Sequence, residues 1–280
     1  MIEKHEVLID GENNRQISLD IRFNGKKNQN PVILFIHGFK GFKDWGPWNA
    51  MSNIFADAGF TCVKLNFSHN GIDPTDLQDI SLVEIFGLNT FSIEMTEIGT
   101  VLSWLESAEN PYKDYINKGQ FFVIGHSLGG SLALLKSIED SRISKLATWA
   151  APCDILKYKD LESDEVWKER GYVPILNGRT GQSYPIQYIF REDIVDNRGR
   201  FDLMDKLDRF NKPLLVVHGD EDPTVNIEDA RKIAEIVDHS ILLEIENGDH
   251  VFGAGHPHQE DSLPEVLNDV VEETIEFFNM

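Results

Sequence analysis

The chain has 280 residues, which corresponds to one large domain or two small ones, and a chain of this length buries enough surface to fold without disulfides or structural metals. Its 41% apolar and 26% charged residues exclude disordered, collagen-like and coiled-coil proteins. The formal net charge of −21 opposes binding to phosphate backbones and anionic lipids, so neither nucleic acid nor a membrane is an expected partner.

The cysteines and the first residues bear on the cellular compartment. Cys62 and Cys153 lie in apolar surroundings without metal-ligand spacing, which favours a reduced pair in the cytoplasm. The first six residues contain no basic region followed by an apolar run, so we expect no signal peptide. No stretch reaches about 18 uncharged apolar residues, so we expect no membrane span and a cytoplasmic protein.

Strand patterns open the chain and then alternate with helical ones. Residues 7–9 and 17–23 alternate around a turn-rich segment, which predicts an antiparallel hairpin or meander. From residue 31 onwards, continuous apolar runs alternate with segments of helical spacing, and this predicts a mostly parallel sheet with helices on both faces. The predicted strands are 31–36, 62–67, 121–124, 146–150, 214–217 and 241–245, and the predicted helices are about 48–58, 93–107, 128–139, 227–237 and 264–278.

One interval interrupts this alternation. Between Pro152 and Lys212 no buried-strand run occurs, and the composition is charged and aromatic. Within the interval, residues 172–176 and 184–188 bracket a glycine-rich turn, which predicts a small hairpin. Because a structureless loop of this length is improbable in a compact domain, we predict an inserted cap over 152–212 and a core domain formed by 1–151 and 213–280.

The segment Gly125-His126-Ser127-Leu128-Gly129 matches the pattern G-x-S-x-G between a predicted strand and a predicted helix. Glycines two residues on either side of the serine relieve crowding in a sharp turn. The serine then stands at a helix N-terminus, where backbone N–H groups favour developing negative charge. An ordinary glycine-bounded turn is the alternative, but the flanking strand and helix favour a nucleophile at Ser127.

A serine hydroxyl is a weak nucleophile and needs a base, which in turn needs an orienting acid. Asp222 and His250 follow the predicted strands 214–217 and 241–245. Functional groups gather beyond the carboxyl ends of parallel strands, so we expect Asp222 and His250 to meet Ser127 there. Asp220 and Glu221 are alternative acids, but Asp222 is preferred because it lies three residues past the glycine that ends its strand.

The loop His37-Gly38-Phe39-Lys40-Gly41 follows the first buried strand. Where a nucleophile sits on a strand-to-helix turn of this kind, one oxyanion donor comes from such a loop and the other is the N–H after the nucleophile. We therefore predict the backbone N–H groups of Phe39 and Leu128 as the oxyanion hole. Trp45 and Trp48, close behind the loop, belong either to the core or to a pocket wall.

Four further histidines are not assigned to the chemistry. His37 and His218 stand in turns at strand ends, and we expect structural roles for both. His256 and His258 could be drawn as part of a metal cluster with nearby acids, but the intervening proline and the loop setting favour a solvated loop. No metal site, dinucleotide fingerprint or P-loop is predicted.

Taken together, these segments resemble those of the α/β-hydrolases, and they span most of the chain. Within that superfamily the chain is similar to the feruloyl/cinnamoyl-esterase and dienelactone-hydrolase-like branch, which also carries an inserted cap before the acid strand. It is similar too to serine-aminopeptidase and acyl-thioesterase relatives. The resemblance implies a serine hydrolase that uses no metal or organic cofactor.

We therefore expect an esterase that cleaves small to medium acyl esters through an acyl-enzyme, with a small-molecule ester as its partner. The cap would roof the pocket, and Trp167 and Tyr172 are its candidate pocket residues. A peptidase, amidase or thioesterase with the same residues is the first alternative. A non-catalytic, ligand-binding member of the fold is the second. The sequence leaves the acyl group, the leaving group and the oligomeric state open.

Overall fold

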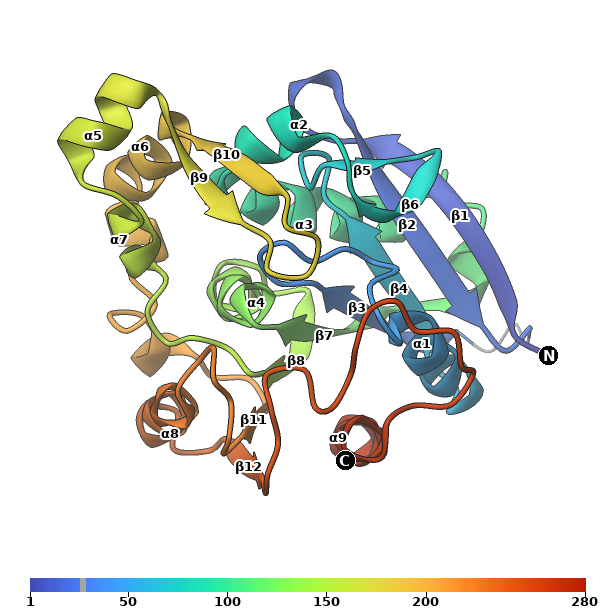
Figure 1. Cartoon of the computed structure of the whole chain (residues 1–280). Coiled ribbons are helices and arrows are strands. Elements are labelled where there is room, and N and C mark those ends of the chain that lie inside the picture. The colour runs from blue at the N-terminus through green and yellow to red at the C-terminus, as the bar shows by residue number, and fades with distance from the viewer. Residues whose placement is uncertain (26–28) are drawn as a thin grey trace.

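The structure, a computed structural model, describes residues 1–25 and 29–280. Within these residues, eight strands form one sheet in the order β1-β2-β4-β3-β7-β8-β11-β12 (Figure 1). β2 runs antiparallel to both of its neighbours, and all other pairs are parallel. The strands are β1 (Glu3–Asp10), β2 (Gln16–Phe23), β3 (Asn30–Ile36), β4 (Thr61–Asn66), β7 (Ile116–His126), β8 (Ile143–Trp149), β11 (Leu214–Gly219) and β12 (Ile241–Ile245).

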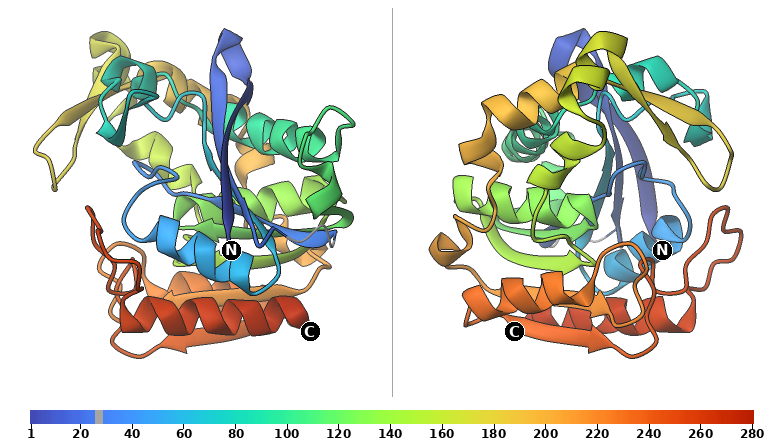
Figure 2. Two further views of the ribbon diagram at one scale, coloured as in Figure 1. Left: turned by 90° about the vertical axis from the view of Figure 1, so that its right-hand side faces the viewer. Right: turned by 60° about the vertical axis from the view of Figure 1, so that its left-hand side comes forward.

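Helices cover both faces of this sheet (Figure 2). Along β3, Ile33 and Phe35 belong to the apolar cluster beneath one pair of helices, whereas Val32 and Leu34 belong to the cluster on the opposite face. Successive strand residues point to opposite faces, so only a continuous apolar run satisfies both layers. One face carries α1 (Trp48–Asp57) and α9 (Glu265–Asn279), and the other carries α3 (Phe91–Glu106), α4 (Leu128–Glu139) and α8 (Ile227–Ile236).

The predicted fold class is confirmed, and the five predicted helices are present within two residues of their expected bounds. Three short elements after β4 were not predicted: the strands β5 (Ile72–Asp73) and β6 (Asp76–Ile80) and the helix α2 (Val83–Gly87). They are too short to carry a periodic pattern. α3, with 16 residues, is the longest described helix. None of the described helices has both the length and the apolar character that crossing a bilayer requires.

Residues 152–212, which we call the cap segment, contain the predicted hairpin. β9 (Tyr172–Leu176) pairs antiparallel with β10 (Ser183–Gln187). The segment also contains helices that were not predicted, because they are short and rich in charged residues. They are η3 (Leu156–Asp160), α5 (Asp164–Arg170), α6 (Tyr188–Asp196), α7 (Arg198–Phe201) and η4 (Leu207–Arg209). The division into a cap domain and a core domain stays a prediction.

The hairpin packs against α2 and the β5–β6 hairpin, close to the carboxyl ends of the strands. A Cβ on Gly87 would lie 2.1 Å from the carbonyl oxygen of Pro185, so only glycine allows α2 to approach β10 this closely. The rings of Phe86 and Tyr184 are 5.0 Å apart. At the tip of the hairpin, Arg179 donates a 2.7 Å hydrogen bond to Asp79. These contacts hold the tip of the hairpin against the core.

Candidate active site

Ser127 stands on a strained turn between β7 and α4. Its φ of 54° and ψ of −129° lie outside the regions that non-glycine residues ordinarily adopt. A Cβ on Gly125 would lie 2.4 Å from the carbonyl oxygen of Gly129, and one on Gly129 would lie 2.4 Å from that of His37. Both glycines of the G-x-S-x-G pattern are therefore required by sterics, as the sequence interpretation expects.

Three side chains from different strand ends form one hydrogen-bonded chain. The Nδ1 atom of His250 lies 2.7 Å from Oδ2 of Asp222, and its Nε2 lies 3.0 Å from Oγ of Ser127. A carboxylate only accepts hydrogen bonds, so Nδ1 carries a proton and Nε2 of the neutral ring accepts from the serine hydroxyl. This arrangement allows His250 to take the hydroxyl proton while the new imidazolium faces a carboxylate.

Asp222 is the one of the three consecutive acids that meets His250. Its carboxylate is fully buried, whereas Asp220 and Glu221 are exposed. Besides His250, it accepts a 2.9 Å hydrogen bond from the Val225 N–H, and Nε2 of His218 lies 3.2 Å away. Burial alone would raise the pKa of Asp222, but these hydrogen bonds outweigh burial and hold the pKa well below its usual range. The acid therefore stays ionised beside the imidazole.

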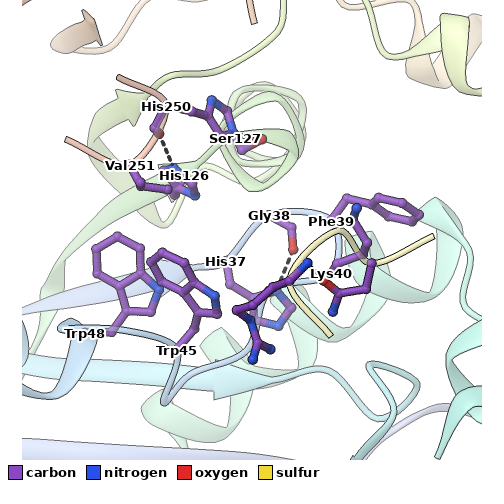
Figure 3. A pocket seen from close by; sticks show the side chains of 13 residues that line it. His37, Gly38, Phe39, Lys40, Trp45, Trp48, His126, Ser127, His250 and Val251 are labelled. Atoms are coloured by element: carbon purple, nitrogen blue, oxygen red, sulfur yellow. Dashed lines mark hydrogen bonds between the residues drawn. The ribbon is translucent and has the colours of Figure 1, made fainter. Parts of the chain in front are cut away.

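Two histidines that the sequence leaves outside the chemistry support this chain of groups. His218 contacts Asp222, as just described, and also donates to the Val225 carbonyl at 2.9 Å. His126 donates from Nε2 to the main-chain carbonyl of His250 at 2.9 Å (Figure 3). Burial lowers the pKa of His126 to about 3, so its ring is neutral and fixed as a donor. In the sequence, only the position of His126 directly before Ser127 could have indicated this contact with His250.

The loop after β3 lies against the serine. A Cβ on Gly38 would lie 2.8 Å from the Cβ of Ser127, so a side chain there would collide with the serine. Phe39 follows it and lines the cavity beside Ser127. Leu128 is the first residue of α4, and a backbone N–H at that position has no partner within its helix. The assignment of these two N–H groups as the oxyanion hole stays a prediction.

A cavity of about 240 Å³ opens beside Ser127. Trp45 and Trp48 lie next to each other on one wall, and His37, Phe39 and Lys40 line the cavity from the loop that follows β3 (Figure 3). Trp48 is also part of the core beneath α1, so both roles considered for it apply. The lining residues are His37, Gly38, Phe39, Lys40, Gly41, Trp45, Trp48, His126, Ser127, Asn177, Arg179, His250 and Val251.

The expected pocket roles of Trp167 and Tyr172 are wrong, since neither residue lines this cavity. Trp167 is fully buried within the cap segment, where its indole N–H donates to the Ile186 carbonyl at 3.1 Å. Tyr172 is 39% exposed. The cap residues that reach the cavity are Asn177 and Arg179, at the turn of the hairpin. Aromatic content indicated the wrong part of the segment because the hairpin buries Trp167 against its own backbone.

His256 also departs from its expected place in a solvated loop. Its Nδ1 accepts from the Gly46 N–H at 2.8 Å and its Nε2 donates to the Gln78 carbonyl at 2.8 Å. Its ring stacks on Trp45, with centroids 6.0 Å apart. Both ring nitrogens are therefore used in holding a cavity wall, and neither is free to bind a metal.

One acidic cluster in the described residues has metal-like geometry. Single carboxylate oxygens of Glu6, Asp20 and Asp44 lie within 4.8 Å of one another. Lys43 lies 2.6 Å from Asp44 and 3.1 Å from Glu6, and Lys64 lies 3.5 Å from Asp20. Because buried ammonium groups already neutralise these carboxylates, the cluster is an ion-pair network rather than a metal site.

Comparison with known proteins identifies the family and the fold of the chain. Residues 31–171 match the family described as the alpha/beta hydrolase fold. The chain is 22% identical to monoacylglycerol lipase ABHD6 of Rattus norvegicus, over 86% of this chain and 76% of the relative. Est1E from Butyrivibrio proteoclasticus superimposes with a TM-score of 0.71 at 18% identity, covering 98% of this chain and 97% of the other. An esterase of Pyrococcus furiosus gives 0.64 at 14% identity, covering 99% and 91%. At these identities the structural likeness establishes the fold.

Proposed function

The chain belongs to the α/β-hydrolase fold family and is a hydrolase, and from that premise we propose that it cleaves carboxylic esters of small to medium acyl groups through an acyl-enzyme intermediate. The observation that carries the proposal is the hydrogen-bonded chain from Ser127 through His250 to Asp222. It lies at the carboxyl ends of β7, β11 and β12, beside a cavity.

In the proposed reaction, Oγ of Ser127 attacks the ester carbonyl while Nε2 of His250 takes the hydroxyl proton. The carbonyl oxygen becomes an oxyanion, held by the N–H groups of Phe39 and Leu128. Collapse of this intermediate breaks the ester C–O bond, and His250 returns its proton to the departing alcohol. Water then attacks the acyl-enzyme, again with His250 as the base, and releases the acid and free Ser127.

The size of the cavity supports small substrates. Its volume of about 240 Å³ is below the roughly 300–1,000 Å³ that is usual for pockets holding drug-sized ligands. The relative ABHD6 is named a monoacylglycerol lipase, and a long acyl chain would extend beyond this cavity. We therefore favour short acyl esters over long-chain monoacylglycerols.

The test is Ser127→Ala, assayed with p-nitrophenyl acetate and a fluorophosphonate probe. We expect the wild type to hydrolyse the ester and to be labelled at Ser127. The variant should fold normally, resist labelling and lose several orders of magnitude in turnover, because no other group can form the acyl-enzyme. Full activity in the variant, or a wild type that resists both ester and probe, would contradict the proposal. Matched amides and thioesters would test the peptidase, amidase and thioesterase alternatives.

A further inference from the structure

The lining of the cavity has the opposite charge balance to the rest of the chain. The whole chain carries a formal charge of −21, yet the lining contains two basic side chains, Lys40 and Arg179, and no aspartate or glutamate. A positively charged cavity in an acidic protein attracts anions locally against the field of the whole molecule. The positive charge of the cavity lining is therefore a property of this site and not of the protein surface in general.

The two cations differ in how their charge is balanced. Arg179 donates to Asp79, so its guanidinium is already paired. In the described part of the chain Lys40 forms no ion pair, and no neighbouring charge contributes to the shift of its pKa. Its side chain is half-buried, and burial lowers the pKa of this lysine. A partly desolvated ammonium without a counter-charge forms the strongest favourable interaction when an anion binds beside it.

Lys40 lines the same cavity as Ser127 and His250, where the proposed chemistry takes place. It lies between Phe39 and Gly41 on the loop that passes Ser127 (Figure 3). The Gly41 N–H donates to the Gly38 carbonyl at 2.9 Å and closes a tight turn, in which Lys40 has a φ of 62°. Glycine or asparagine would adopt this φ with less strain, yet a long cationic side chain is present.

We propose that Lys40, assisted by Arg179, selects esters that carry a carboxylate a few atoms from the ester carbonyl. This inference rests on the proposed esterase function and names its substrate class. A substrate whose two ends are only a few atoms apart fits within the cavity of about 240 Å³. A short dicarboxylic acid esterified at one end has the required size and charge.

The experiment compares kcat/KM for two nearly isosteric esters. Monomethyl glutarate carries a carboxylate, and the methyl ester of glutaramic acid replaces it with a neutral amide. We expect the wild type to prefer the anion, and Lys40→Gln to lower the ratio of anionic to neutral kcat/KM about tenfold. Lys40→Arg should retain most of the preference. Arg179→Gln should lower the ratio only a few-fold, because Arg179 is already paired with Asp79.

A control variant and a second substrate pair isolate the effect of the Lys40 charge on substrate preference. Lys168→Gln removes the same charge from an exposed position on α5 that does not line the cavity, and it should leave the ratio unchanged. A second pair, 3-acetoxypropanoate and its amide, moves the carboxylate to the alcohol side. The substrate pair whose anionic-to-neutral ratio falls more in Lys40→Gln shows whether the carboxylate binds on the acyl side or on the alcohol side of the ester.

The outcomes separate this inference from the function on which it rests. If Ser127 takes the probe and p-nitrophenyl acetate is hydrolysed, but Lys40→Gln leaves both ratios unchanged, the inference is overturned. An equal fall for anionic and neutral esters also overturns it, since Lys40 would then act on all esters alike. Neither labelling nor hydrolysis of any ester would instead overturn the proposed function.

Discussion

Backbone strain at Ser127 is what presents its hydroxyl to His250. A residue with φ of 54° and ψ of −129° costs on the order of 1–3 kcal/mol, and the surrounding packing must maintain it. Here Gly125 lets α4 approach β7 closely and Gly129 lets α4 approach the end of β3, while the Ser127 N–H donates to the Trp149 carbonyl at 2.8 Å. The strained backbone conformation is therefore that of the proposed nucleophile itself.

The identity of the acid gives a prediction at the scale of single residues. Replacing Asp222 by Asn keeps the shape but can hold the imidazole in the wrong tautomer, a change that costs about 10⁴ in turnover in a trypsin-like enzyme. We expect Asp222→Asn to lose a similar factor in kcat on p-nitrophenyl acetate. The matched control, Asp220→Asn at the exposed neighbouring acid, should stay within about tenfold of the wild type. The reverse pattern would move the acid to Asp220.

At the scale of elements, the hairpin β9–β10 has two separate tasks. Its inner side buries Trp167 and Tyr184, which tie the strands to α5 and α2. Its turn supplies Asn177 and Arg179 to the cavity. The aromatic residues of the cap segment therefore stabilise the hairpin, while polar residues at its tip face the proposed substrate.

This separation predicts opposite effects for two aromatic residues. Trp167→Ala removes a fully buried ring and should lower the free energy of unfolding by about 3–5 kcal/mol. Tyr172→Ala at an exposed position should change it by about 0.5 kcal/mol or less. Urea unfolding of both variants, followed by kcat/KM on esters of graded chain length, measures both properties. If Trp167→Ala kept the stability but changed the order of preferred esters, the ring would line the pocket after all.

At the scale of the whole molecule, buried acids set how stability depends on pH. Glu94 on α3 is buried, and its carboxylate accepts a 2.6 Å hydrogen bond from Asn89 without a cationic partner in the described residues. Burial raises the pKa of Glu94 to about 8, helped by the nearby acids Glu97 and Asp193. The folded protein therefore holds a proton there that the unfolded chain has already released above about pH 4.5.

The stabilising contribution of protonated Glu94 is complete below about pH 4.5 and is lost progressively as the pH rises through 8. Glu94→Gln keeps the acceptor but cannot ionise, so it should gain stability relative to the wild type between pH 5 and 8, by a few kcal/mol at most. Urea unfolding across that range measures the difference. Glu273→Gln, at an exposed position on α9, is the control and should run parallel to the wild type. A parallel curve for Glu94→Gln would show that Glu94 ionises normally.

The sequence by itself determined the fold class, the strand and helix order of the core, and the three residues that the structure joins by hydrogen bonds. These properties are local, because apolar periodicity reports burial along one element and a strand-to-helix turn needs glycines at set positions beside Ser127. Only the tertiary structure decided which residues face the cavity. The cavity brings together Lys40, Asn177 and Arg179 from elements far apart in the chain, and the contact from His126 to His250 also joins distant elements. The burial of Trp167 depends on how the hairpin folds back. No local sequence pattern encodes such tertiary contacts, because they are determined by the packing of one element against another.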